Sequence, residues 1–420
     1  MNNNKETYKI LYKVNDHLLL TDKFYKNLET ESIHKLKDYK GILLLDIDAS
    51  PEKTRSYFKI DTEDVLQGYK EDVSLLWDTS LPSYPTILKD ALQEGRLYGI
   101  NSSYPDFKNF PQEIIKTKNL KVNIVGLGDV GGILATGLKL LSNETISSIG
   151  LYDTSPDKVS RWEQELSSIF DMSSPISPKV YSLKEEELFD CDAFIFCVSV
   201  GVPTLGSEVN DVRMAQFQGN KKVISLYGKK AREAAFKGMF FVVSDPVDLL
   251  CKAVFIESNK NEEGELDFRG IPSHRIKGFG LGVMNARAAY IASKEYPELD
   301  YINEGRVYGP HGEGLIVANS LKSYNNEASL FLTDMTKNAN LKVRETGFKP
   351  YIAPALSSGA LSILSALRGE PHYSSSFLGG IYMGARNSII AGATIFEKDS
   401  MPHMLKERLK DTEEYLQALY

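Results

Sequence analysis

The chain has 420 residues, 42% of them hydrophobic and 25% charged, which is typical of a globular protein with two or three domains. Its net charge of −7 argues against nucleic acid or an anionic membrane as a partner. No apolar run approaches the roughly 18 residues of a membrane helix, and no apolar leader follows Met1, so we expect a cytoplasmic protein.

The three cysteines, Cys191, Cys197 and Cys251, fall in or near apolar runs. They are interpreted as reduced core thiols, because a disulfide framework or a zinc site would need another spacing. None of the six histidines joins cysteines or carboxylates at ligand spacing, so we expect no metal.

Residues 1 to about 118 contain short β-like runs, at 8–12 and 41–45, among charged and aromatic stretches. The end of the region is punctuated by prolines, namely Pro82, Pro85, Pro105 and Pro111. We predict a small α+β region without a chemical motif. It is either a packing or oligomerisation module or the carrier of a regulatory site.

Strand-like and helix-like runs alternate from Leu120 onward. The predicted strands are 121–125, 148–152, 193–200, 222–226 and 239–243, and a helix is predicted from Gly131 to about Leu141. This alternation is typical of α/β proteins with a parallel, doubly wound sheet of the Rossmann type. In such sheets ligands bind beyond the carboxyl ends of the strands.

The rest of the chain is predicted to be mixed α+β. A polar segment at 259–265 indicates a surface loop, a helix follows 278–280, and a charged helix at about 404–419 closes the chain. We therefore expect an accessory region, a Rossmann domain and a substrate domain, with the respective bounds 1–118, 119–282 and 283–420.

A glycine-rich loop, Gly126-Leu-Gly128-Asp-Val-Gly131, lies between the first predicted strand and its helix. Gly126 allows the tight turn, Gly128 allows the backbone to approach a pyrophosphate, and Gly131 allows the helix to pack closely. The helix N-terminus, with Asp129 and Val130, points unpaired N–H groups at the phosphates.

An acid, Asp153, lies 22 residues after Gly131, at the end of the next predicted strand. A carboxylate in this position accepts hydrogen bonds from the ribose hydroxyls of the adenosine, and it repels a 2′-phosphate. The spacing therefore predicts NAD, in preference to NADP, as the cofactor.

A histidine, His311, stands in the run Val-Tyr-Gly-Pro-His-Gly-Glu-Gly at 307–314, 24 residues after Arg287. An arginine can hold a carboxylate with two parallel hydrogen bonds, and a histidine can move a proton near neutral pH. These are the groups needed when hydride passes between a nicotinamide and a carbon that bears a hydroxyl beside a carboxylate.

From about Asn119 to the C-terminus, the chain resembles the lactate/malate dehydrogenase superfamily. The ordered motifs that carry the resemblance are 123–131, 198–203, 212–213 with Asn220, 244–248, 270–280, 285–287 and 309–312. The N-terminal region has no counterpart in the usual architecture of that family.

The resemblance implies a role for several residues. Arg287 would hold the substrate carboxylate, His311 would be the proton donor and acceptor, and Arg213 would polarise the carbonyl from a loop that closes over the substrate. Val200 and Gly201 would contact the cofactor at the end of the strand that precedes this loop.

Two positions depart from the family pattern. Met284 stands where the family has the aspartate that orients the histidine, and Asp245 stands where the family has an asparagine. We hypothesise that Asp245 orients His311, or that it contacts an unusual substrate such as one with an amino group. Near Thr204, where the family discriminates lactate from malate, there is no arginine, which argues against malate.

The leading interpretation is an NAD-dependent oxidoreductase acting on a small 2-hydroxy or 2-oxo acid, with His311, Arg213 and Asp245 as catalytic residues. The substrate would be held by Arg287, Arg213 and Thr204. Two alternatives remain, an NAD-dependent dehydrogenase of an amino or imino acid and a non-catalytic NAD(H)-binding homologue. The resemblance also implies a homo-oligomer, either a dimer or a tetramer.

Overall fold

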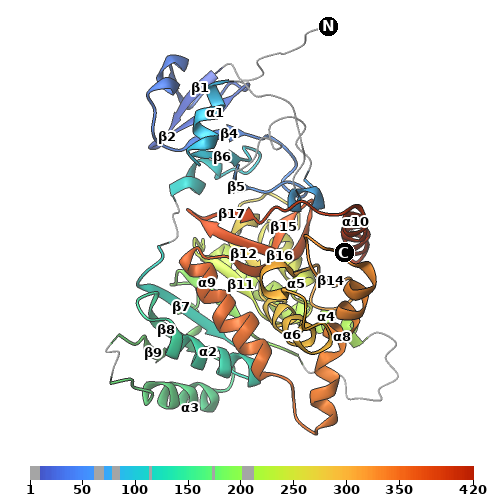
Figure 1. Ribbon diagram of the computed structural model, residues 1–420. Coiled ribbons are helices and arrows are strands. Elements are labelled where there is room, and N and C mark those ends of the chain that lie inside the picture. Colours follow the sequence, from blue (N-terminus) through green and yellow to red (C-terminus); the bar gives the residue numbers. More distant parts are fainter. Residues whose placement is uncertain (1–9, 61–70, 78–85, 113–115, 173–175, 201–211) are drawn as a thin grey trace.

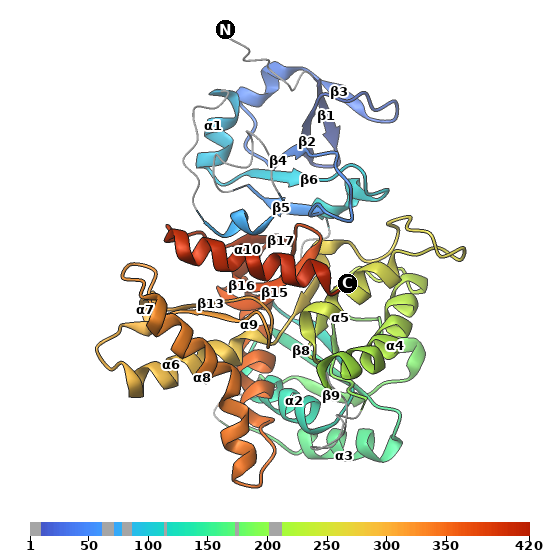
Figure 2. The same ribbon diagram turned by 90° about the vertical axis from the view of Figure 1, so that its right-hand side faces the viewer.

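The computed structural model describes residues 10–60, 71–77, 86–112, 116–172, 176–200 and 212–420. Within these ranges, strands from all parts of the chain join into one 15-stranded sheet. Figures 1 and 2 show the N-terminal strands at one end of the molecule and the helices α2 (Asp129–Leu141) and α3 (Pro156–Ser167) at the other. The fold is α/β, as predicted.

The N-terminal segment, residues 10–112, forms one end of the sheet and is called the N-terminal module below. Its strands are β1 (Ile10–Val14), β2 (His17–Thr21), β3 (Glu29–Glu31), β4 (Leu43–Asp46), β5 (Tyr57–Lys59) and β6 (Leu97–Ile100). Its helices are α1 (Thr86–Gln93) and the 3-10 helices η1 (Ile33–Lys37), η3 (Val73–Leu76) and η4 (Phe107–Gln112). β2, β4 and β6 run parallel as neighbours, and the module is the small α+β region predicted.

The middle of the chain forms six parallel strands in the order β9-β8-β7-β10-β11-β12. These strands are β7 (Leu120–Val125), β8 (Ile146–Tyr152), β9 (Lys179–Ser182), β10 (Ala193–Phe196), β11 (Met239–Val242) and β12 (Ile276–Gly278). The connecting helices include α2, α3, α4 (Val212–Glu233), α5 (Val247–Ser258) and two 3-10 turns, η5 (Glu185–Glu187) and η6 (Ser273–Arg275). β10 and β11 are buried along their whole length, as parallel strands covered on both faces should be.

One predicted strand of this region is wrong. Residues 222–226 belong to the long helix α4, not to the sheet. The fully buried positions of α4 are Phe217, Asn220, Ile224, Gly228 and Ala231, which recur every three or four residues. This period of a helix face, extended over several turns, outweighs the short apolar run that suggested a strand.

The C-terminal part packs helices around an antiparallel meander. Its helices are α6 (Leu281–Glu295), α7 (Tyr301–Glu304), α8 (Asn326–Glu345), the π-helix η7 (Pro354–Leu361), α9 (Ser362–Arg368) and α10 (His403–Ala418). Its strands are the separate pair β13 (Arg306–Tyr308) and β14 (Ile316–Ala318), and the meander β15 (His372–Leu378), β16 (Ile381–Ile390) and β17 (Ala393–Phe396). β15 pairs with β12, so the meander extends the parallel sheet.

The N-terminal module joins the other end of this meander, because β5 pairs with β17 in parallel. Buried polar contacts reinforce the junction. The Ser56 backbone N–H donates to Ser273 Oγ at 3.0 Å, and Ser56 Oγ lies 2.8 Å from His274 Nδ1. Burial lowers the pKa of His274 to about 3, so this imidazole is neutral at the junction.

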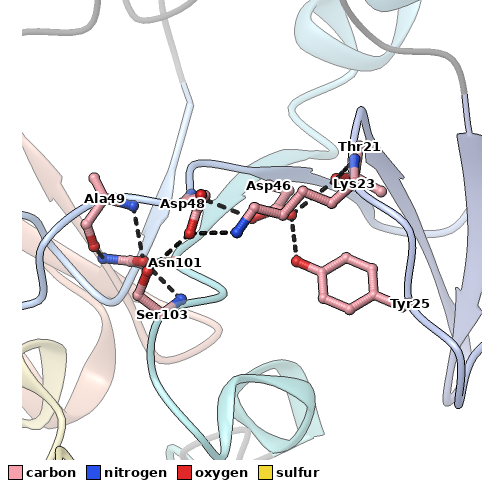
Figure 3. A network of polar contacts seen from close by, with 8 residues as sticks. All are labelled: Thr21, Lys23, Tyr25, Asp46, Asp48, Ala49, Asn101 and Ser103. Carbon is pink, nitrogen blue, oxygen red and sulfur yellow. Dashed lines mark hydrogen bonds and ion pairs between the residues drawn. The ribbon is translucent and has the colours of Figure 1, made fainter.

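A polar network lies at the carboxyl ends of β2, β4 and β6 in the N-terminal module (Figure 3). Asp46, which is 9% exposed, accepts hydrogen bonds on Oδ2 from Thr21 Oγ1 at 2.9 Å and from Tyr25 OH at 2.6 Å. Burial and the neighbouring Asp46 carboxylate raise the pKa of Tyr25, so this phenol stays a donor. Asp46 therefore ties the ends of two parallel strands to the following loop.

The other half of the network involves Asp48, which has a positive φ of 28°. Its carboxylate pairs with Lys23 and accepts a hydrogen bond from Ser103 Oγ at 2.9 Å. The Lys23 contact lowers the pKa of Asp48 below its usual range. Asn101, which is fully buried, exchanges two hydrogen bonds with the backbone of Ala49. Together these contacts fix the loops at this edge of the module.

We expect Asp46→Ala to destabilise the N-terminal module by about 2–4 kcal/mol, because it leaves two hydroxyl donors without their acceptor. The measurement is amide hydrogen exchange of β1, β2 and β4. Asp22→Ala removes an exposed carboxylate from the neighbouring turn and should change the protection by less than about 0.5 kcal/mol. Equal protection in the two variants would show that the network does not stabilise the module.

Candidate functional site

The glycine-rich loop lies between β7 and α2, as the sequence predicted. Gly126 has a φ of 91°, and a Cβ on it would lie 2.7 Å from Val198 N. A Cβ on Gly131 would lie 1.9 Å from the carbonyl oxygen of Gly126. Side chains at either position would push α2 away from the sheet, so the close turn depends on both glycines.

The space in front of α2 is open. Gly128 precedes the helix, and no heavy atom lies within 4 Å of the position that its Cβ would take. Asp129 and Val130 form the first turn, whose backbone N–H groups have no partner within a helix. This arrangement suits the pyrophosphate of a dinucleotide.

Asp153 follows β8 directly, with a side chain that is 10% exposed. Its Oδ2 accepts a hydrogen bond from the Leu127 backbone N–H at 2.8 Å, and its Oδ1 accepts one from Ser155 N at 3.0 Å. The carboxylate thus fixes the glycine-rich loop as well as lying where the sequence predicts a ribose partner. The residues of the loop and Asp153 together fit an NAD molecule.

The loops after β10 and β11 follow the carboxyl ends of the neighbouring strands. Asn220, which is fully buried on α4, links these loops, because its Oδ1 accepts from Val200 N at 2.7 Å and its Nδ2 donates to the Asp245 carbonyl at 2.6 Å. The sequence assigned Asn220 no role, although a buried asparagine on a helix signals a polar partner. Gly201 and Thr204 lie outside the described residues, and Arg213 belongs to the first turn of α4.

His311 lies on the loop after β13, facing the loop after β11. Its Nδ1 lies 2.8 Å from Asp245 Oδ1, and the two side chains are 18% and 45% exposed. Gly280 makes room for the imidazole, since a Cβ there would lie 2.9 Å from His311 Cβ. The structure therefore pairs the histidine with the aspartate that replaces the family's asparagine.

A second acid, Asp248, is buried beside the backbone of the histidine. Its Oδ2 accepts a hydrogen bond from the His311 backbone N–H at 3.4 Å, and its Oδ1 accepts one from Ser375 Oγ at 2.6 Å. Burial raises the pKa of Asp248 to about 6. The sequence reasoning missed this residue, whose signal is an acid in the first turn of the apolar helix α5.

Arg287 lies on α6 and is partly buried. Its Nη1 donates to Met284 Sδ at 3.5 Å, so the residue that replaces the family's aspartate contacts the arginine instead of the histidine. Burial lowers the pKa of Arg287, and the Asp245 carboxylate acts in the opposite direction. Asp245 contacts His311, and Gly280, the residue before α6, lies against the same histidine.

No cluster of three or more candidate metal-ligating side chains occurs in the described part of the chain. The three cysteines are free thiols, and burial raises the pKa of each, that of Cys197 to about 12. Among the described helices, none has both the length and the apolar content that crossing a membrane requires.

The fold and the loop together define a dinucleotide-binding protein of the Rossmann type. Residues 120–265 match the family described as the lactate/malate dehydrogenase NAD binding domain, which identifies NAD as the cofactor of this domain. Over these residues the chain is similar to the lactate/malate dehydrogenase superfamily, as its ordered motifs predicted.

Three known proteins illustrate the similarity. L-lactate dehydrogenase 2 of Staphylococcus aureus (strain JH9) is 25% identical over 200 residues, which make up 47% of this chain and 56% of that protein. The chain thus matches little more than half the length of this relative. A structure of the minor L-lactate dehydrogenase from Enterococcus mundtii has a TM-score of 0.58 and 20% identity, covering 72% of this chain and 98% of that one. A structure of the malate dehydrogenase from Aeropyrum pernix has a TM-score of 0.57 and 16% identity, and the match covers 71% of this chain and 96% of that one.

The raised pKa of Asp248 predicts a pH effect on stability. Its folded-state pKa of about 6 exceeds the ordinary 3.8, so the folded protein binds the proton more tightly, and this contribution to stability is lost as the pH rises through about 6. The free energy of unfolding of Asp248→Asn relative to the wild type should therefore increase by about 2–3 kcal/mol between pH 4 and 7. Urea unfolding across this range measures it, and parallel curves for the two proteins would contradict the assignment.

Proposed function

We propose that the protein is an NAD-dependent dehydrogenase that interconverts a small 2-hydroxy acid and the corresponding 2-oxo acid. The observation that carries this proposal is the contact of His311 with Asp245, on the loop after β11, beside the start of the helix α6 that bears Arg287. Ligands of doubly wound sheets bind at the carboxyl ends of the strands, where the glycine-rich loop also lies.

Arg287 is the proposed anchor of the substrate carboxylate. Its contact with Met284 uses a thioether, which is a weak acceptor, so the contact does not saturate the guanidinium. A planar guanidinium can hold a carboxylate with two parallel hydrogen bonds and so orient the neighbouring carbon. For Arg213, in the first turn of α4, we propose the role that the resemblance implies, which is to polarise the substrate carbonyl.

His311 is the proposed proton donor and acceptor. With Nδ1–H donating to Asp245, the Nε2 atom is left to exchange a proton with the substrate oxygen. In oxidation, Nε2 takes the hydroxyl proton and Asp245 stabilises the resulting imidazolium; in reduction, Nε2 returns the proton. NAD, when bound, supplies the acceptor or donor of hydride.

The departures at Asp245 and Met284 are compatible with proton transfer by His311. The acid that the family carries on the helix of Arg287 is absent, and an acid on the loop after β11 contacts the imidazole instead. The imidazole is thus still paired with a carboxylate, but the carboxylate comes from the loop after β11 and not from α6.

We expect Asp245→Asn to lower kcat by about 10²–10⁴-fold, because an amide can hold the imidazole in the wrong tautomer and cannot stabilise its charge. The double variant D245N/M284D puts an acid on α6, three residues before Arg287, and should recover at least about tenfold of the loss. Steady-state turnover as a function of pH measures both effects. If D245N kept the turnover and the pH dependence of the wild type, Asp245 would have no part in the reaction.

An amino or imino acid is the second candidate substrate class. It is favoured by the 45% exposure of the Asp245 side chain, which lets an ammonium group approach the carboxylate. In that case Arg287 would hold the carboxylate of the amino acid and Asp245 its nitrogen.

A panel of 2-oxo acids separates these candidates. We expect NADH oxidation with at least one 2-oxo acid in the absence of ammonium, because His311 can protonate the carbonyl oxygen directly. Turnover that requires ammonium would instead assign the amino-acid reaction. Tight NADH binding without turnover on any member of the panel would identify a non-catalytic NAD(H)-binding homologue.

We also propose a homo-oligomer, a dimer or a tetramer, in the cytoplasm. Large exposed apolar side chains support a protein partner, and several of them follow one another along α8 and into η7, namely Leu341, Val343, Phe348, Ile352 and Leu361. Three free thiols are typical of a reducing compartment.

A further inference from the structure

A lysine of the C-terminal part reaches the first turn of the cofactor-binding helix. Lys349 Nζ lies 3.0 Å from Asp129 Oδ2, although the two residues are 220 positions apart in the chain. Asp129 is the first residue of α2, directly after the open position at Gly128. A cation thus stands at the helix end that faces the proposed pyrophosphate.

The packing of two helices places this lysine. The π-helix η7 begins at Pro354, shortly after Lys349, and lies against α2 at a distance that only small residues allow. A Cβ on Gly137 would lie 2.6 Å from Ala360 Cβ, and a Cβ on Gly359 would lie 2.8 Å from a methyl carbon of Leu134. The segment before η7 is therefore held along α2, next to its N-terminus.

Without Lys349, the N-terminus of α2 would place the negative Asp129 carboxylate next to a negative pyrophosphate. A pyrophosphate carries negative charge, and the Asp129 carboxylate would repel it at close range. The helix N-terminus favours an anion but has only a partial positive charge to offer. Lys349 supplies a full positive charge at the same place, with a side chain that is 79% exposed and so can rotate toward an arriving ligand.

We propose that Lys349 is a cofactor-binding residue that exchanges its contact with Asp129 for the pyrophosphate of NAD, so that the substrate domain closes the nucleotide site. This inference rests on the proposed function only in that NAD must bind to α2. It goes further because it assigns part of the affinity for the cofactor to a residue outside the Rossmann domain. It also gives Asp129 the role of holding the lysine in place before the cofactor arrives.

The test is direct binding, without turnover. The protein is titrated with NADH by fluorescence and with ADP-ribose and adenosine by calorimetry. We expect Lys349→Ala to weaken the binding of NADH and of ADP-ribose about tenfold at low salt, and to leave adenosine within about twofold, since adenosine has no pyrophosphate. The loss should shrink as salt is added, because the contact is exposed.

The controls separate a charge contact from a structural effect. Lys349→Arg should restore most of the affinity, and Lys342→Ala, which removes an exposed lysine of α8, should bind as the wild type does. In the background of Asp129→Asn, Lys349→Ala should still weaken NADH binding. An effect that vanished in that background would mean that Lys349 only neutralises Asp129, and would overturn the proposed exchange.

The remaining outcomes are also decisive. A wild-type protein that bound neither NADH nor ADP-ribose would overturn the proposed function together with this inference. A wild-type protein that bound both, with K349A equal to it within about twofold, would overturn the assignment of Lys349 alone. Equal weakening of NADH and adenosine by K349A would indicate a distorted domain and would also count against the pyrophosphate contact.

Discussion

The hydrogen bond between His311 and Asp245, 2.8 Å long, is the interaction on which the proposed chemistry depends. A neutral imidazole has one donor and one acceptor nitrogen, and a hydrogen-bond partner decides which nitrogen carries the proton. Asp245 is such a partner, and its loop is held in turn by Asn220. The buried Asp248 holds the histidine itself, because its carboxylate accepts a hydrogen bond from the His311 backbone N–H. The proposed proton-transfer group is therefore oriented by contacts from the loop after β11 and from the start of α5.

The same sheet edge brings the two halves of the site together. Parallel strands place the glycine-rich loop, Asp153 and the loop of Asp245 at their carboxyl ends, whereas Arg287 and His311 come from the C-terminal part. Two close approaches of backbone keep the halves in contact, at Gly280 beside His311 and at Gly137 beside η7. Small residues at these points allow distances that any larger side chain would prevent.

Much of this site could be predicted from local patterns, because each motif carries its own chemistry. The glycine spacing, Asp153 and the paired departures at Met284 and Asp245 are visible in the sequence, and the last pair suggested the contact later seen with His311. Contacts between distant segments could not be predicted in this way. In the sequence, Lys349 has no feature that distinguishes it from other surface lysines, because its contact with Asp129 arises only when η7 packs on α2. Part of α4 was predicted as a strand because a short apolar run does not reveal the period of the helix.

The pairing of β5 with β17 has a consequence for how the sheet ends. Without the N-terminal module, β17 would be an edge strand, with a row of backbone donors and acceptors open to any other extended chain. The module places β5 beside β17, with Phe58 opposite Thr394, and the short, charged β3 becomes the edge strand at this end of the sheet. The N-terminal module thus ends the sheet with a short strand that carries two glutamates, and such an edge disfavours pairing with the strands of other chains.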